Sequence, residues 1–138
     1  MTGAGRTTIV VGYVPTPEGL AAVDYAVSHA RTTGGARIVL VNSGAHGRDS
    51  DPKFAAADDL DALAARFDEA GLEHEIRQSA QALSPAEEIL TAAEDTDADL
   101  IVIGLRRRSP VGKLFLGSSS QQVILDAACP VVAVKRAD

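Results

Sequence analysis

The segment from Thr7 to Tyr13 reads Thr-Thr-Ile-Val-Val-Gly-Tyr, a short, β-branched and almost continuously apolar run. Such a run is typical of a strand that is covered on both faces, as the strands of a parallel sheet are. Thr16 and Pro17 follow it and predict a helix start, because threonine accepts a hydrogen bond from a first-turn N–H and proline loses nothing at the first helical position. This order of strand and helix is the first sign of the fold class.

The same order recurs along the rest of the chain. Apolar runs from Arg37 to Asn42, Leu100 to Gly104 and Val131 to Lys135 predict three more strands. A half-polar run from Glu73 to Ser79 predicts an exposed edge strand. Helical stripes of apolar residues separate these runs. The pattern therefore predicts one α/β domain in which five strands alternate with four helices, joined by right-handed crossovers.

Capping residues and glycines predict the helix boundaries. A capping side chain stands before a proline at three places: Thr16-Pro17, Asp51-Pro52 and Ser84-Pro85. The spacing of a capping box occurs twice, at Ser84 with Glu87 and at Ser118 with Gln121. We expect the first two helices to end at Gly34-Gly35 and at Gly71, and the fourth to run from Ser118 to about Ala128. The buried stripe expected for the first helix consists of Leu20, Val23, Val27 and Ala30.

Charge is distributed unevenly over the 138 residues. Thirteen basic and nineteen acidic residues give a net charge of −6, which argues against a general nucleic-acid binder that neutralises phosphates over a basic face. From Leu100 to Leu125 there is no acidic residue. This segment holds four positive charges, named the basic island below: Arg106, Arg107, Arg108 and Lys113. The remainder, with nine positive and nineteen negative residues, carries −10.

The only cysteine, Cys129, excludes an intramolecular disulfide and a cysteine-rich metal site, and we expect it to be a buried small apolar residue. The residues before Thr7 do not resemble a signal peptide, and no apolar stretch is long enough to cross a bilayer. These observations predict a cytoplasmic protein.

Ligands of an open parallel sheet bind beyond the carboxyl ends of its strands, where the strand order reverses. The segment that follows Gly104 faces that edge and contains the basic island. At its far end, Ser118, Ser119 and Ser120 open a helix whose N–H groups and dipole favour an anion, and the arginines could close over a phosphate. The alternative also stands: a glycine that ends a strand, serines that cap a helix and arginines on a solvated loop.

The sequence lacks the residues that several other kinds of functional site require. Leu114 stands where a Walker loop needs serine or threonine, no G-x-G-x-x-G follows the first strand, and Val14 and Pro15 supply no phosphoacceptor carboxylate. The histidines fall on separate elements: His29 near a helix end, His46 in a loop and His74 facing solvent on the edge strand. An acidic helix face, favoured near a helix N-terminus, is interpreted as solvated: Asp58, Asp59 and Asp61.

Three strings together resemble the universal stress protein family: Ala98-Asp99-Leu100-Ile101-Val102-Ile103-Gly104, Gly117-Ser118, and Cys129-Pro130-Val131-Val132-Ala133-Val134. The resemblance covers about Thr7 to Lys135 of a single domain, residues 1–138. It implies a three-layer, doubly wound, five-stranded parallel sheet in the order 3-2-1-4-5 with four helices. It also implies a stress-response homodimer joined through Val131 to Lys135 and, in one branch of the family, ATP or AMP bound at the strand ends.

That nucleotide-binding branch carries the motif G-x2-G-x9-G-[ST]. Gly104 matches its first position and Gly117-Ser118 match its last pair, whereas Arg107 replaces the second glycine. An acidic residue usually follows the first strand in this branch, and Val14 stands there instead. The resemblance thus implies an altered cleft for ATP, AMP or another phosphate.

The residues expected at this cleft are Tyr13, Val14, Val41, Ile103, Gly104, Arg106, Arg107, Gly117, Ser118, Ser119 and Ser120. The three serines would hold phosphate, and Val14 and Val41 would contact the base. No catalytic or metal-binding residue is expected. Two alternatives remain: an interaction module whose basic island meets an acidic partner without nucleotide, and a nucleotide hydrolase, for which no base or metal carboxylate is evident near the cleft.

Overall fold

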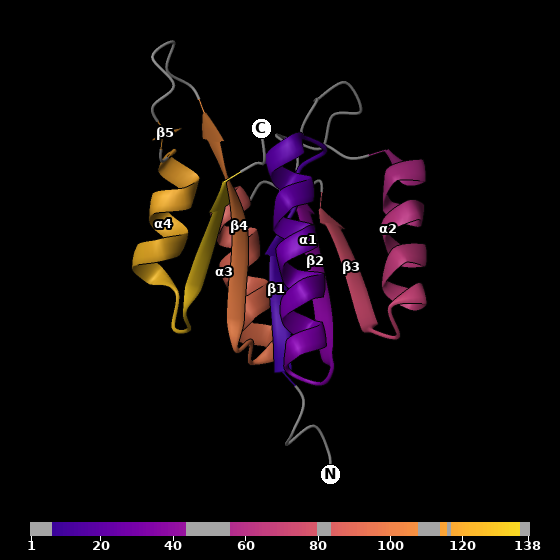
Figure 1. Ribbon diagram of the computed structural model, residues 1–138. Helices are drawn as coiled ribbons and strands as arrows, with labels where there is room; N and C mark the ends of the chain where they lie inside the picture. The colour runs from indigo at the N-terminus through magenta and orange to yellow at the C-terminus, as the bar shows by residue number, and fades with distance from the viewer. Residues whose placement is uncertain (1–6, 44–55, 80–83, 108–113, 116, 136–138) are drawn as a thin grey trace.

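The computed structural model describes residues 7–43, 56–79, 84–107, 114–115 and 117–135 (Figure 1). Its elements are β1 (Thr7–Gly12), α1 (Pro17–Thr32), β2 (Ala36–Ser43), α2 (Ala57–Glu69), β3 (Glu73–Ser79), α3 (Pro85–Thr96), β4 (Leu100–Arg107), β5 (Leu114–Phe115), α4 (Ser118–Asp126) and β6 (Val131–Lys135). Five strands pair in parallel in the spatial order β3-β2-β1-β4-β6. The predicted doubly wound α/β fold is confirmed. No helix in the described part is long and apolar enough to span a membrane.

Helices cover both faces of the sheet, α1 and α2 on one and α3 and α4 on the other (Figure 1). Alternate residues of the central strands point to opposite faces, so a strand that is covered on both sides must be apolar throughout. The first layer of the core contains Ile9, Val11, Ile38, Leu40, Val23, Val27 and Phe67. The second contains Val10, Val39, Ile101, Ile103, Ala86, Ile89 and Val123.

Most of the predicted helix boundaries are confirmed. The Thr16 hydroxyl accepts a hydrogen bond from the Gly19 N–H at 3.2 Å, and Ser84 and Glu87 form a reciprocal capping box. Beyond the ends of α1 and α2, Gly34 and Gly71 have φ values of 82° and 72°, a conformation that favours glycine.

The predicted start of α4 near Ser118 is confirmed, but its predicted cap is wrong. Gly117, with an extended backbone, is the N-cap of α4, so Ser118 is already helical and its predicted capping box with Gln121 does not form. The N-cap of α2 is Ala56, later than the predicted Asp51-Pro52 pair, which lies outside the described residues. At α4 a polar residue suited to capping stands one position after the N-cap.

Leu20 also departs from its prediction, because 46% of its surface is exposed. The buried stripe of α1 is formed mainly by small residues, including Ala22, Ala26 and Ala30, which bring the helix close to the sheet. Leu20 lies one turn before Asp24, which forms an ion pair with Arg66 of α2. Leu20 therefore lies on the side of α1 and not on the face that packs against the sheet.

The strand predicted to end at Gly104 continues to Arg107, so the segment that follows Gly104 begins as strand. The two-residue strand β5 pairs antiparallel with this extension, with Arg106 opposite Phe115 and Arg107 opposite Leu114. The antiparallel pair is an addition to the five parallel strands. Extended backbone at a run of arginines carries no apolar signal, which explains why the sequence did not indicate it.

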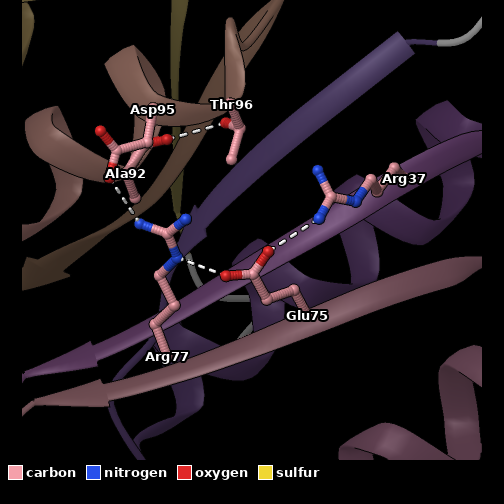
Figure 2. A network of polar contacts seen from close by, with 6 residues as sticks. All are labelled: Arg37, Glu75, Arg77, Ala92, Asp95 and Thr96. Atoms are coloured by element: carbon pink, nitrogen blue, oxygen red, sulfur yellow. Dashed lines mark hydrogen bonds and ion pairs between the residues drawn. The ribbon is translucent and has the colours of Figure 1, made fainter. Parts of the chain in front are cut away.

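A chain of ion pairs, called the polar cluster below, joins β2, β3 and α3 (Figure 2). Glu75 accepts hydrogen bonds from Arg37 Nη2 at 2.7 Å and Arg77 Nε at 2.6 Å, and Arg77 Nη1 donates to Asp95 Oδ2 at 3.2 Å. The hydrogen bond to Glu75 raises the pKa of the Arg77 guanidinium above its usual value, and the hydrogen bond to Asp95 raises it further. The predicted half-polar edge strand is thus confirmed as β3.

His74 was expected to face solvent, and that prediction is wrong. Its ring packs on Phe67 of α2, with ring centroids 5.6 Å apart, and its Nδ1 lies 3.6 Å from Asp68 Oδ1. Residues 73, 75 and 77 lie on the α3 face of β3, so His74 must point toward α2. A histidine in a polar strand gives no sequence signal of which face is covered.

Candidate functional site

A pocket lies at the carboxyl ends of β1, β2 and β4, the upper edge of the sheet in Figure 1. The strand order reverses between β1 and β4, the position at which open parallel sheets bind ligands. Its lining consists of Gly12, Tyr13, Val14, Glu18, Gly19, Val41, Pro85, Ile89, Ile103, Gly104, Ser119, Ser120 and Val123. The cavity of about 110 Å³ has several times the space that one water requires. The cavity is therefore large enough to accept part of a small ligand.

Two glycines allow the first turn of α1 to pack closely against the sheet. A Cβ on Gly104 would collide with the carbonyl oxygen of Glu18, and a Cβ on Gly19 would collide with the carbonyl oxygen of Val14. Any side chain at Gly104 would force the backbone of β4 away from that of Glu18, and any side chain at Gly19 would force the backbone of α1 away from that of Val14. Gly104, which the sequence placed beside an anion, thus has a packing role that helps form the pocket wall.

Three helices direct their N-termini at the pocket, since its lining includes Glu18 and Gly19 of α1, Pro85 of α3, and Ser119 and Ser120 of α4. Each N-terminus presents first-turn N–H groups and the positive end of a helix dipole. These N–H groups and dipoles contribute positive potential at the pocket, while valine and isoleucine side chains supply its apolar part.

The three helix N-termini differ in whether a capping side chain and a first-turn acidic residue already interact with their N–H groups and dipole. Thr16 caps α1 and Ser84 caps α3, and both helices carry acidic residues in their first turn. Helix α4 has Gly117 as its N-cap, receives no side-chain cap, and has no acidic residue in its first turn. Of the three, the α4 N-terminus is best able to receive an anion, because its first-turn N–H groups and dipole have no carboxylate of their own.

Side-chain amide groups join the strand ends at this edge of the sheet. The fully buried Asn42 donates from Nδ2 to the Tyr13 carbonyl at 3.0 Å and accepts from Gln78 Nε2 at 2.9 Å. The Tyr13 N–H donates to the Val41 carbonyl at 2.9 Å. These bonds tie the ends of β1, β2 and β3 together. Asn42 was assigned no role from the sequence, although an asparagine closing an apolar strand is a recognisable signal.

Tyr13 contributes to two regions at once. It lines the pocket, yet it is only 4% exposed and packs in the core beneath α1 and α2. Burial raises the pKa of its phenol, and the nearby carboxylate of Asp59 raises it further. The ring is therefore primarily a structural element.

Seven of the predicted site residues meet at the pocket: Tyr13, Val14, Val41, Ile103, Gly104, Ser119 and Ser120. Gly117 and Ser118 directly precede the two lining serines, and Ser118 is exposed. Arg106 and Arg107 continue β4 beyond Gly104, while their side chains, and all of Arg108 and Lys113, lie outside what the structure describes. Arg107, where the family motif has glycine, has strand backbone paired with Leu114.

Sequence reasoning missed several lining residues, among them Glu18, Gly19, Pro85, Ile89 and Val123. All five belong to the first two turns of helices. In an alternating α/β sheet the helices begin at the edge where the parallel strands end, so this signal was available from the predicted element order.

The remaining candidates do not join the pocket. His29 stacks on Tyr25 at a centroid distance of 5.9 Å, and His46 lies outside the described residues. Burial, with a smaller effect of Asp99, raises the pKa of the partly buried Cys129 thiol, in keeping with an apolar role. Within the described ranges, no three histidine, cysteine or acidic side chains gather closely enough to hold a metal ion.

Comparison with known proteins agrees with this arrangement. The family model described as "Universal stress protein family" matches residues 5–135. A universal stress protein of Mycolicibacterium smegmatis is 41% identical over 129 residues, 92% of this chain and 96% of that protein.

Solved structures show the same fold. A universal stress protein from Archaeoglobus fulgidus has a TM-score of 0.74 at 30% identity, covering 94% of this chain and 98% of that one. The structure of the universal stress protein from the same organism in complex with dAMP has a TM-score of 0.69 at 26% identity, with coverage of 94% and 98%. Both the family match and these relatives span nearly the whole sequence, and the chain belongs to the universal stress protein family.

Proposed function

We propose that this chain is a cytoplasmic stress-response protein that binds an adenine nucleotide, AMP or ATP, in the pocket at the switch point and acts by binding and not by catalysis. The observation that carries the proposal is the α4 N-terminus, which meets the pocket without a side-chain cap and without a first-turn carboxylate. The dAMP complex of the Archaeoglobus fulgidus relative supports it.

The phosphate is assigned to the start of α4. The N–H groups and hydroxyls of Ser119 and Ser120 would donate to its oxygens, and the helix dipole would favour its charge. Arg106 and Arg107 follow Gly104 in β4, so the basic island begins two residues beyond the pocket wall and adds positive potential there.

The base is assigned to the apolar side. Val14, Val41 and Ile103 line the pocket at the ends of β1, β2 and β4. Apolar walls combined with a few convergent polar groups are the usual composition of a small-molecule site. A purine ring would bury apolar surface here that inorganic phosphate does not possess, so AMP is expected to bind more tightly than phosphate.

Isothermal titration with ATP, AMP and inorganic phosphate tests this proposal. We expect heat with the nucleotides, and at least a tenfold loss of AMP affinity in the variant Ser119→Asp, whose carboxylate would occupy the position of the phosphate charge. The same substitution should leave stability unchanged or raise it, because an acidic residue at a helix N-terminus is favourable.

The control variant Ser28→Asp adds the same charge to an exposed position near the opposite end of α1. It should bind AMP as the wild type does. No heat with any of the three ligands at millimolar concentration would reject nucleotide binding. In that case the interaction module with an acidic partner becomes the better hypothesis. Phosphate release from ATP that disappears in Ser118→Ala would instead show hydrolysis.

We also propose a homodimer joined through β6. Among the described strands β6 pairs only with β4, so its other edge presents backbone groups, and its residues Val131 to Val134 are only partly buried. The neighbouring helix α4 exposes Ile124 and Leu125, the latter to 78%. An open apolar edge of this kind favours pairing with a second strand. Sedimentation should show a dimer at micromolar concentration and a monomer for Val132→Lys; a wild-type monomer would contradict this proposal.

A further inference from the structure

A second cavity lies at the opposite edge of the sheet from the pocket, between the lower ends of α3 and α4 in Figure 1. Its volume is about 290 Å³, more than twice the 110 Å³ of the pocket. All its lining residues lie within 90–98 and 126–129, and we call it the lower groove. It shares no lining residue with the pocket, so the two are separate sites.

The floor of the lower groove is apolar. It is formed by partly buried side chains, most of them small: Leu90, Ala93, Ala98, Ala127 and Cys129. Burial raises the pKa of the Cys129 thiol, and the carboxylate of Asp99 raises it further, so this side chain adds no charge to the floor. Small side chains on two helices leave a space that an apolar side chain from another molecule can fill.

The rim of the lower groove is acidic. Glu94, Asp97 and Asp126 are exposed lining residues, and within the described part of the chain none of their carboxylates forms an ion pair. No lysine or arginine occurs among the described lining residues. Asp95 of the same helix is different, because it is paired with Arg77. The negative charge of the rim is therefore not compensated by the described residues.

The ends of the helices add to this negative potential. Helices α3 and α4 both end at the lower groove, and neither has a basic residue in its last turn. Acidic side chains are unfavourable there, because a helix C-terminus is the negative end of its dipole. Asp97 also ends α3 with a φ of 57°, a conformation in which glycine is usual. Such local rules are expected to be broken at functional or strained sites.

We propose that the lower groove binds a basic segment of a partner protein, with an apolar side chain on the groove floor and flanking lysine or arginine side chains paired with Glu94, Asp97 and Asp126. Charge complementarity selects this occupant, since the rim repels nucleic acids and anionic membranes and attracts cations. An apolar centre within a polar rim is also the usual composition of a protein interface. This inference goes beyond nucleotide binding and does not depend on it.

The probe for this site is a fluorescently labelled peptide of sequence Lys-Leu-Lys-Leu-Lys with blocked termini, whose binding is measured by fluorescence anisotropy. The comparison peptide, Lys-Ser-Lys-Ser-Lys, carries the same charge without the apolar side chains. We expect the leucine peptide to bind at least about tenfold more tightly, because burial of one leucine accounts for a factor of that size. Its affinity should fall as salt is added, because the rim is exposed.

Two variants change the groove in different ways. The double variant Glu94→Gln/Asp126→Asn removes two rim charges and should weaken binding of the leucine peptide about fivefold, the effect of two exposed ion pairs. Ala128→Met adds a larger apolar side chain at an exposed lining position without changing charge, and should weaken binding severalfold by filling the groove.

The matched control is Asp61→Asn/Glu69→Gln, which removes the same charge from exposed positions of α2, with Glu69 in the last turn of that helix. It should bind the leucine peptide as the wild type does. Urea denaturation should show that Glu94→Gln/Asp126→Asn is as stable as the wild type or more so, because acids near helix C-termini are unfavourable. Its loss of peptide binding would then not result from unfolding.

Four outcomes would overturn the inference. Equal losses in the groove and control double variants would show that the peptide binds the acidic surface in general. Equal affinity for the serine and leucine peptides, or unchanged binding by Ala128→Met, would show that no apolar side chain enters the groove. Binding of spermidine with the same dependence on Glu94 and Asp126, without binding of the leucine peptide, would assign the groove to a small organic cation. A wild type that binds neither probe at millimolar concentration would reject the site altogether.

Discussion

The pocket and the polar cluster lie on the same sheet and satisfy their polar groups in opposite ways. In the polar cluster, Arg37 and Arg77 share Glu75 and Arg77 also reaches Asp95, so the charges are paired with one another (Figure 2). At the pocket, the α4 N-terminus faces an open cavity without a capping side chain. Polar groups that the fold satisfies indicate a structural role, whereas the uncapped helix start beside a cavity supports the ligand site proposed above.

The register explains why the two regions differ. Glu75 and Arg77 of β3 lie opposite Val39 and Val41 of β2, on the face that α3 and α4 cover further along the sheet. At the edge strand the apolar layer gives way to charges that are about one third exposed. The pocket lies where three helices begin, so its backbone donors cannot be paired by neighbouring strands.

The largest effect should come from filling the close approach that forms the pocket wall. In Gly104→Ala the new Cβ would meet the backbone of Glu18, so α1 or β4 must shift. We expect a loss of about 3 kcal/mol in the free energy of unfolding, measured by urea denaturation, because overpacking against backbone has no flexible side chain to absorb it.

Gly117→Ala is the control for that substitution. A Cβ added to Gly117 would meet no heavy atom within 4 Å, and the residue has an ordinary negative φ of −68°. The cost of this substitution should stay below about 1 kcal/mol, the small difference between glycine and alanine at an N-cap. Equal losses at positions 104 and 117 would show that the close packing of α1 on β4 does not form the pocket wall.

A smaller effect is expected at the polar cluster. Arg77→Met keeps the apolar stem and removes the contacts to Glu75 and Asp95. Because these side chains are about one third to one half exposed, the loss in unfolding free energy should be about 1 kcal/mol and should shrink at high salt.

AMP affinity distinguishes the two regions in this variant. If the polar cluster is structural, Arg77→Met leaves AMP binding unchanged in isothermal titration. A tenfold loss of AMP affinity without a change in stability would show instead that the cluster belongs to the binding site.

The sequence predicted the fold almost completely because its signals are local. Apolar runs, the capping box at Ser84 and the glycines at positions 34 and 71 each specify one element boundary. Errors arose where two residues compete for one role, as Gly117 and Ser118 do for the α4 N-cap. The face occupied by His74 and the exposure of Leu20 depend on which helix covers which strand, a relation between distant segments.

The candidate site was only partly predictable for the same reason. The strand-end residues Val14, Val41 and Ile103 follow from the switch-point rule. The element order places Glu18 and Ile89 near the same edge, because helices begin where parallel strands end, but only the structure shows that α1 and α3 approach closely enough for both residues to line the pocket. The packing role of Gly104 was hidden because its partner, the carbonyl of Glu18, is 86 positions away in the chain.

The smallest effect concerns Tyr13, the residue that belongs to both the pocket and the core. The pKa of its phenol is raised above the ordinary value of 10.0, by burial first and by Asp59 second. The folded protein therefore holds this proton more tightly than the unfolded chain does. Its contribution to stability is complete below pH 10 and is lost as the pH rises through the folded-state pKa.

Tyr13→Phe keeps the ring and removes the ionising group, so its unfolding free energy should match that of the wild type at pH 7 and fall less steeply above pH 10. Urea denaturation between pH 8 and pH 11 measures the two slopes, and Tyr25→Phe, at an exposed position, controls for loss of a phenol in general. Identical slopes for wild type and Tyr13→Phe would place the phenol in contact with solvent, on the open side of the pocket. Its ring would then be available to a bound base, and the apolar wall assigned to Val14 and Val41 would extend to Tyr13.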